Sequence, residues 1–207
     1  MKRALAAIAF ALACSGSATA QDTSMSFFVT SANPGKGGDL GGLQGADAYC
    51  DTLAKAAGST GKSWKAYLST DAENAKDRIG TGPWYNAKGE KIADDVASLH
   101  SDSNNLTKQT ALNEKGEVIN GRGDTPNRHD ILTGSKADGT AATETCGNWT
   151  MGGADGSAIV GHSDRTGLND SAEAKSWNSS HATRGGCTVE AFKGTGGEGL
   201  FYCFAVK

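Results

Sequence analysis

This 207-residue chain contains four widely spaced cysteines, and their spacing indicates which chemistry they can carry out. They are Cys50, Cys146, Cys187 and Cys203. Zinc sites built from cysteine usually contain closely spaced pairs such as C-x-x-C, and no such pair occurs here. The spacing therefore favours disulfides over a zinc–thiolate site. Four cysteines can pair in three ways, and the spacing does not choose among them.

The four histidines show no spacing typical of a metal site. They are His100, His129, His162 and His181, and they form no H-x-H or H-x-x-x-H pair. Surface or capping roles are predicted for them, and no set of metal ligands is identified from the sequence. The adjacent pairs Asp77-Arg78 and Asp164-Arg165 are predicted to be solvated charges.

The loops between residues 124 and 181 gather polar side chains. Members of this set are Asp124, Asn127, His129, Asp130, Asn148, Asp164 and Asn178. Taken singly, each residue is expected to satisfy backbone amides in glycine-rich turns. Taken together, loops on a rigid scaffold are where ligand sites tend to form.

Catalytic motifs are missing from the sequence. There is no Gly-x-Ser-x-Gly, and no cysteine after the first fourteen residues would stay free once the four had paired. The adjacent acids Asp94 and Asp95 would face apart in an extended segment. The prediction is a protein that is not an enzyme, although a secreted enzyme of unrecognised chemistry stays open.

The first twenty residues have the three parts of a secretory signal peptide. Lys2 and Arg3 are followed by an apolar run of about ten residues and by an A-x-A site at 18–20. Export to the periplasm or the cell exterior is therefore predicted, with residues 21–207 forming one mature domain. Lipid anchoring at Cys14 is a minor alternative.

The composition argues against two classes of partner. Residues 21–207 keep 18 of the 20 Lys and Arg and all 23 Asp and Glu, so their net charge is near −5. No basic patch is present, which disfavours a nucleic-acid partner. No second apolar run has the length of a transmembrane segment. The 29 glycines predict many turns and a small core, which disulfides would help to stabilise.

Hydrophobic periodicity predicts a few regular elements within long loops. A helix is expected over 43–57, where an apolar stripe includes Cys50 and Asp47 lies near the N-terminus. Strands are expected at 26–30 and, half-buried, at 62–69. The apolar C-terminus, 199–207, is typical of a buried central strand. Shorter elements are predicted at 74–79, 96–100, 117–119, 131–133 and 158–160.

Several segments resemble the endostatin domain. GGLQGADAYC at 41–50 followed by SWKAYLS at 63–69 is similar to its opening helix and strand. TGSKADG at 133–139, CGNW at 146–149 and LFYC at 200–203 are similar to its later part. The chain also resembles secreted bacterial lectin-like proteins that share NRHDILTGS at 127–135 and GLFYCF at 199–204. The resemblance spans about residues 26–207.

The resemblance implies a fold and a disulfide pattern. The fold is α+β and C-type-lectin-like (endostatin-like), with a small twisted antiparallel sheet, one or two helices, long loops and two disulfides. The implied pairing is nested, with Cys50 bonded to Cys203 and Cys146 bonded to Cys187. Fold analogy alone does not establish a function.

C-type lectins that bind sugar do so through calcium held by acidic and amide oxygens. Here Thr125-Pro126-Asn127 stands where those proteins have Glu-Pro-Asn, and 176–179 reads Ser-Trp-Asn-Ser in place of a motif that ends in Asp. A calcium cofactor is therefore possible, but its usual acidic ligands are partly missing.

The resulting hypothesis is an exported, non-catalytic recognition protein that binds carbohydrate or an envelope glycan through its long loops. The alternative is a cell-envelope or adhesion module that binds a protein partner without a sugar site. The candidate ligand-binding residues are Asn127, His129, Asp130, Asn148, Trp149, Trp177 and Asn178.

Overall fold

A computed structural model describes residues 24–206. Its helices and strands are short apart from one helix and one strand, as the glycine content suggested. In chain order they are β1 (Phe27–Val29), α1 (Gly42–Ala56), β2 (Ser63–Ala66), α2 (Ala75–Arg78), β3 (Trp84–Tyr85), β4 (Lys91–Ala93), α3 (Val96–Leu99), β5 (Asp130–Leu132), α4 (Cys146–Trp149), β6 (Ile159–His162), β7 (His181–Ala182), α5 (Val189–Thr195) and β8 (Gly197–Val206). The predicted signal peptide at 1–20 lies outside the described residues.

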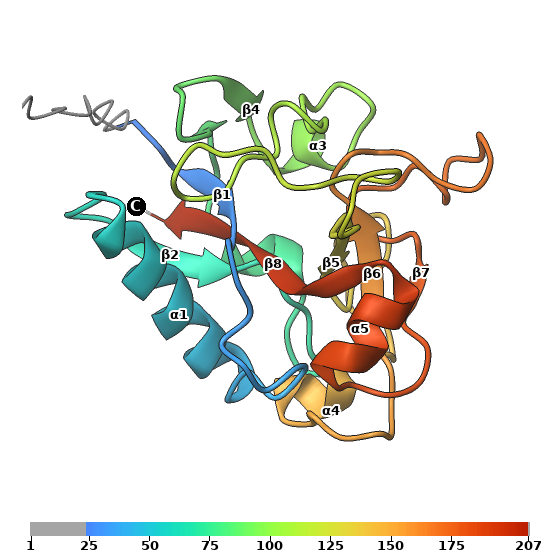
Figure 1. Ribbon diagram of the computed structural model, residues 1–207. Coiled ribbons are helices and arrows are strands. Elements are labelled where there is room, and N and C mark those ends of the chain that lie inside the picture. The colour runs from blue at the N-terminus through green and yellow to red at the C-terminus, as the bar shows by residue number, and fades with distance from the viewer. Residues whose placement is uncertain (1–23, 207) are drawn as a thin grey trace, which may run out of the picture.

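The C-terminal strand β8 organises the main sheet. One half of β8 pairs antiparallel with β1 and β2, and the other half pairs parallel with β5. The path of strands is β1-β8-β5-β6-β7, with β2 also on β8, while β3 and β4 form a separate hairpin. Figure 1 shows β8 crossing the middle of the molecule, with α1 next to its C-terminal half and β5 to β7 beside its N-terminal half. The prediction of a buried central C-terminal strand is confirmed.

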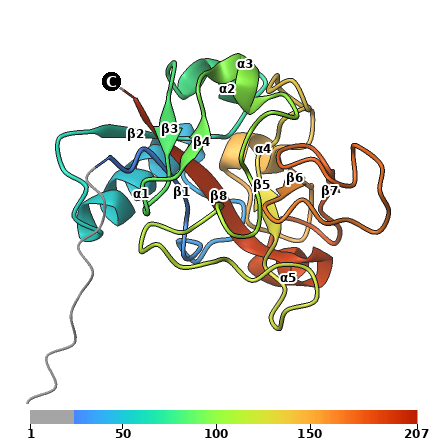
Figure 2. The ribbon, with the colours of Figure 1, turned by 90° about the horizontal axis from the view of Figure 1, so that it is seen from above.

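Both faces of this sheet are buried. Along β8, Phe201 and Cys203 pack into one core with α1, while Tyr202 and Phe204 pack into a second, aromatic core. The strand expected to be half-buried alternates within β2, where Trp64 and Ala66 are buried and Lys65 is partly exposed, but Tyr67, just after β2, is fully buried in the second core. Figure 2 shows the β3–β4 hairpin over β8, and Leu99 of the neighbouring helix α3 also belongs to this second core.

Two disulfides tie the periphery to the core. Cys50 of α1 is bonded to Cys203 of β8, and Cys146 is bonded to Cys187, which is the nested pairing implied by the resemblance. The two closed loops span 153 and 41 residues. In the chain-entropy account, loops of this length stabilise the fold by about 5 and about 4 kcal/mol. The disulfides are consistent with folding in an oxidising compartment.

Several predicted elements differ in detail. The helix predicted at 43–57 is α1, but Asp47 acts by ion pairing with Arg78 and Lys65, beyond the first turn. Segment 117–119 forms only an isolated bridge, and α5 had no prediction. α4 is a turn in the left-handed region, with φ between 48° and 66° from Cys146 to Trp149.

Within residues 24–206, no helix is long and apolar enough to cross a membrane.

Candidate functional site

The candidate site lies where β5, β6 and β7 end beside one another. Asp130 is the first residue of β5 and His129 precedes it, while His162 is the last residue of β6 and His181 is the first of β7. The antiparallel register places Asp130 opposite His162, and His181 opposite Val160. Strand pairing therefore gathers four residues that are spread over 53 positions of the sequence.

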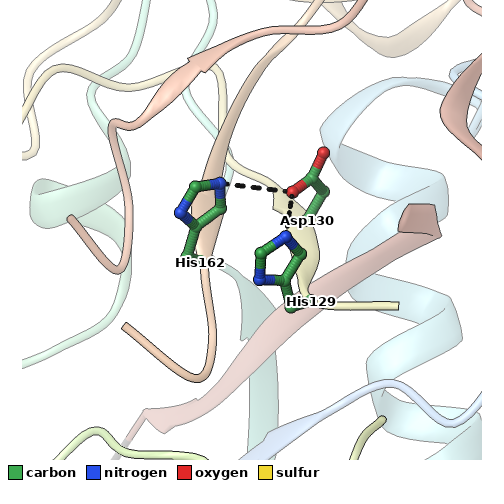
Figure 3. A group of neighbouring side chains, drawn as sticks. All are labelled: His129, Asp130 and His162. Carbon is green, nitrogen blue, oxygen red and sulfur yellow. Dashed lines mark ion pairs between the residues drawn. The ribbon is translucent and has the colours of Figure 1, made fainter. Parts of the chain in front are cut away.

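All three imidazoles direct Nε2 toward the carboxylate of Asp130. Asp130 Oδ1 lies 3.2 Å from His129 Nε2 and 3.3 Å from His162 Nε2, as Figure 3 shows. His181 Nε2 lies 3.7 Å from the other oxygen, Oδ2, and 3.0 Å from His162 Nε2. The rings of His129 and His162 are stacked with centroids 4.3 Å apart. We call these four residues the histidine–aspartate centre.

The opposite nitrogen of each ring is fixed by an acceptor. His129 Nδ1 lies 2.9 Å from Asp164 Oδ1, and His162 Nδ1 lies 2.7 Å from the carbonyl oxygen of Ala174. His181 Nδ1 lies 3.1 Å from the carbonyl oxygen of Ala182. Carboxylate and carbonyl oxygens only accept hydrogen bonds, so each Nδ1 carries hydrogen and each neutral ring presents a lone pair at Nε2.

The carboxylate of Asp130 is the group at the centre that lacks a donor. Its side chain is 2% exposed, and neither oxygen has a hydrogen-bond donor within the described part of the chain. With neutral imidazoles, three nitrogen lone pairs and a negative charge converge in a buried space. That arrangement is costly unless positive charge is supplied, because buried charges need a partner or a metal ion.

The charges at the centre shift two pKa values. Burial alone would lower the pKa of His162, but the carboxylate of Asp130 and the Ala174 carbonyl outweigh it, so the net pKa is raised above 6.5. Burial would raise the pKa of Asp164, yet His129 and the backbone N–H groups of Arg122 and Thr166 hold it below 3.8. Asp164 therefore stays ionised while it orients His129.

Glycines allow the chain to close around the centre. A Cβ on Gly196 would meet Asp130 Oδ2 at 3.1 Å, and the backbone there has a φ of 139°. A Cβ on Gly161, next to His162, would overlap the backbone of Trp177. This close approach lets the backbone N–H of His162 donate a hydrogen bond to the Ser176 carbonyl oxygen at 2.8 Å. Glycine at 161 thus lets the 176–180 segment cover β6, and glycine at 196 leaves room for the carboxylate of Asp130.

A cavity of about 420 Å³ opens next to the centre. Its wall includes all three histidines of the centre and the predicted residue Asn127. His129 and His162 are buried, whereas the side chain of His181 is 37% exposed and stands closest to solvent. The centre is therefore accessible from one side and closed on the other.

The other predicted ligand residues are not part of this arrangement. Trp149 and Trp177 are buried in the core, and Trp149 donates its indole N–H to the Ser69 carbonyl at 2.8 Å. Asn178 is buried and donates to Tyr67 Oη at 3.0 Å, while its Oδ1 accepts from Ser176 Oγ at 3.1 Å. Asn148 lies in the left-handed turn of α4 and accepts from the Asp71 N–H. These contacts serve the fold.

The structure corrects the expected surface or capping role for His129 and His162, which are buried and form the centre with the partly exposed His181. His100 lies apart as the C-cap residue of α3, as expected of a capping histidine, and accepts a hydrogen bond from Tyr67 Oη at 2.6 Å. The predicted solvation is wrong for one member of each acid–base pair, since Arg78 is buried against Asp47 and the side chain of Asp164 is buried against His129, whereas Asp77 is exposed. One signal was available, because His129-Asp130 directly precedes one predicted strand and His162 follows another closely.

Comparison with known proteins gives no assignment for this chain. No protein-family model matches the sequence, and no curated protein matches it significantly. Function is therefore inferred from the geometry of the histidine–aspartate centre.

Proposed function

We propose that this is an exported metal-binding protein whose histidine–aspartate centre holds one transition-metal ion, with Zn²⁺ as the preferred ion. The observation that carries the proposal is the buried carboxylate of Asp130, which has no donor in the described part of the chain and is surrounded by three Nε2 atoms. A cation between them would be bound by each of these groups at once.

Protonation is a weaker way to supply the positive charge. One imidazolium could pair with Asp130, and the raised pKa of His162 points to that ring. A second proton would place two cationic rings face to face, because His129 and His162 are stacked 4.3 Å apart. With one proton alone, two of the three Nε2 lone pairs still face the carboxylate. A metal ion satisfies all of them together.

The separations between the donor atoms suit a tetrahedral ion. Zinc binds imidazole nitrogen and carboxylate oxygen at about 2.0–2.2 Å, so tetrahedral ligands are about 3.3–3.5 Å apart. Asp130 Oδ1 lies 3.2 Å from His129 Nε2 and 3.3 Å from His162 Nε2, and ligand atoms of these three residues all lie within 4.8 Å of one another. His181 stands beside this set of three, with its Nε2 3.7 Å from the other oxygen of Asp130. The Nδ1 contacts supply the outer hydrogen bonds that normally orient metal-binding histidines.

The donor chemistry favours a transition metal over calcium. Calcium takes six to eight oxygen ligands, whereas this centre offers imidazole nitrogens and one carboxylate. Two histidines and a carboxylate, here His129, His162 and Asp130, are also the ligands of many iron(II) sites. Zinc is preferred because His181, whose Nε2 lies 3.0 Å from His162 Nε2, places a further nitrogen beside these three ligands.

The C-type-lectin-like fold, export and carbohydrate recognition remain proposals. The α+β architecture and the nested disulfides support the fold and passage through an oxidising compartment. A sugar site formed by the expected residues has less support, because Trp149, Trp177 and Asn178 are buried and occupied by structural contacts. Metal binding has the stronger geometric basis.

The experiment is calorimetric titration of the chelator-stripped protein with Zn²⁺, followed by elemental analysis. We expect one zinc per chain in the wild type, and we expect Asp130→Asn and His162→Ala to lose it. His100→Gln is the matched control, because it removes a histidine outside the centre. The proposal fails if the wild type takes up no zinc, or if Asp130→Asn binds zinc as tightly as the wild type.

A further inference from the structure

The two arginines that line the cavity beside the centre are unusual among those the structure describes. Arg78, Arg128 and Arg165 each have a carboxylate partner. Arg122 and Arg184 make no side-chain hydrogen bond or ion pair with any residue from 24 to 206, and both line the cavity. Two exposed arginines without a side-chain partner among these residues thus line one cavity.

Backbone contacts hold both arginines at this wall. The N–H of Arg122 donates at 2.6 Å to Asp164 Oδ2, and the other oxygen of the same carboxylate contacts His129. The N–H of Arg184 donates at 3.2 Å to Thr195 Oγ1, in the last turn of α5. The backbone of Arg122 is therefore linked through one side chain to a histidine of the centre.

The charge of the cavity favours an anion. The cavity wall contains two basic residues, Arg122 and Arg184, and one acidic residue, Glu173. The acidic residues at the centre itself are Asp130 and Asp164. A divalent ion at the centre makes the whole site net positive. A guanidinium group forms two parallel hydrogen bonds with a carboxylate or a phosphate, so these oxyanions are the anions it binds best.

The coordination of the ion leaves room for an external ligand. His129, Asp130 and His162 are buried and hold the ion from the closed side, while His181 and the cavity lie on the open side. Zinc with three or four protein ligands can accept a further oxygen ligand and expand to five-coordination. An anionic oxygen entering from the cavity would approach the ion and the two arginines together.

We propose that this cavity binds a small ligand bearing an oxyanion, a phosphate or a carboxylate, which contacts the metal ion and pairs with Arg122 and Arg184. The inference rests on the proposed metal binding and adds the chemical class of the ligand. The exposed side chain of Leu168, also in the cavity wall, would contact a less polar part of such a ligand.

The test uses the full protein loaded with Co²⁺, whose visible spectrum reports on its ligands. Inorganic phosphate and acetate are the two probes, each titrated into the loaded protein after unbound metal has been removed. We expect a saturable spectral change with at least one probe, and the preferred probe identifies the source of the oxyanion. The double variant Arg122→Gln/Arg184→Gln should weaken that binding by at least about tenfold, because hydrogen bonds to charged groups are lost.

Lys193→Gln is the control, since it removes a cation that is paired with Glu190 on α5 and lies outside the cavity. It should leave the titration unchanged. Absence of the cobalt bands themselves would overturn the metal proposal. Bands that respond to neither probe, or that respond equally in the double variant, would overturn the oxyanion inference alone.

Discussion

The buried carboxylates of Asp47 and Asp130 have opposite surroundings. Asp47 accepts from Arg78 at 2.7 and 2.9 Å, from Lys65 at 2.8 Å and from the Ala66 N–H at 2.9 Å. Asp130 is more deeply buried, with 2% of its side chain exposed against 13% for Asp47, yet it has no donor in the described part of the chain. A buried charge is thus not by itself a sign of function.

The difference lies in how completely each carboxylate is satisfied by the protein. At Asp47 the fold supplies two cationic side chains and a backbone donor, so the group joins α1 to β2 and α2. At Asp130 the fold supplies only nitrogen atoms that are themselves acceptors when neutral. The first arrangement is complete without a ligand, and the second becomes complete with a cation.

Replacing Asp47 should give the largest loss of stability. Asp47→Asn leaves the buried guanidinium of Arg78 with only the half-exposed carboxylate of Glu73. Removing one partner from a buried pair costs about 3–5 kcal/mol of unfolding free energy. Urea denaturation with the disulfides intact measures this. Glu198→Gln, which breaks the more exposed pair with Arg128, should cost at most about 1 kcal/mol. Equal losses in the two variants would contradict the structural role of Asp47.

The matched change at Asp130 should behave differently and depend on zinc. At pH 8 with chelator, Asp130→Asn should be neutral or stabilising, because a buried charge without a donor has been removed. With zinc at 100 times its Kd, the wild type should gain about 2.7 kcal/mol and the variant should not. Parallel urea curves with chelator and with zinc measure both effects. A loss in chelator as large as that of Asp47→Asn would show that Asp130 holds the fold together.

The sequence predicts elements that are defined locally. The apolar stripe of 43–57 and the continuous apolar run of the C-terminus contain α1 and β8, since periodicity alone is enough to place them. The disulfide pairing came from the resemblance, because four cysteines allow three pairings. Helix α5 was missed because seven residues with two glycines nearby give little periodic signal.

The centre could not be predicted from spacing because tertiary pairing creates it. His129 and Asp130 are neighbours, but His162 and His181 reach them only when β6 pairs with β5 and β7 pairs with β6. Metal motifs such as H-x-x-x-H detect ligands on one helix, and ligands on three strands have no fixed spacing. The prediction included His129 and Asp130, which lie in the centre, and it grouped them with Trp177 and Asn178, which are buried in the core.

Replacing Asp164 should have a smaller effect, a loss of zinc affinity. This loss would further distinguish the role of Asp130 from that of Asp47. Asp164→Asn keeps an acceptor for His129 Nδ1 but removes the charge, and such outer partners are worth about 10–100-fold in metal affinity. Zinc titration of the variant measures this, and its melting temperature with chelator checks the fold. Asp138→Asn, which alters a turn at Thr140 away from the centre, is the control. Unchanged zinc affinity in Asp164→Asn would mean that His129 is not a ligand.

The smallest expected effect concerns how the stability difference between the wild type and Asp130→Asn depends on pH. The sign of this dependence should reverse when zinc replaces the chelator. The pKa of His162 is raised above 6.5 in the folded protein, so its stabilisation is present below pH 6.5 and is lost as pH rises through the folded pKa. The advantage of the wild type over Asp130→Asn should therefore shrink above pH 6.5 in chelator. With zinc it should grow with pH, because the ligands must be deprotonated to bind metal.

The titration of His100 can be distinguished from that of His162 in this measurement, because burial lowers the pKa of His100 below 6.5. Its contribution is present above pH 6.5 and is lost as pH falls through the lowered value, which is a separate range. Unfolding curves between pH 5 and pH 8, with chelator and with zinc, resolve both ranges. If the difference between the wild type and Asp130→Asn had the same slope with and without zinc, Asp130 would be paired by protons alone. It would then resemble Asp47 as a carboxylate that the protein satisfies by itself.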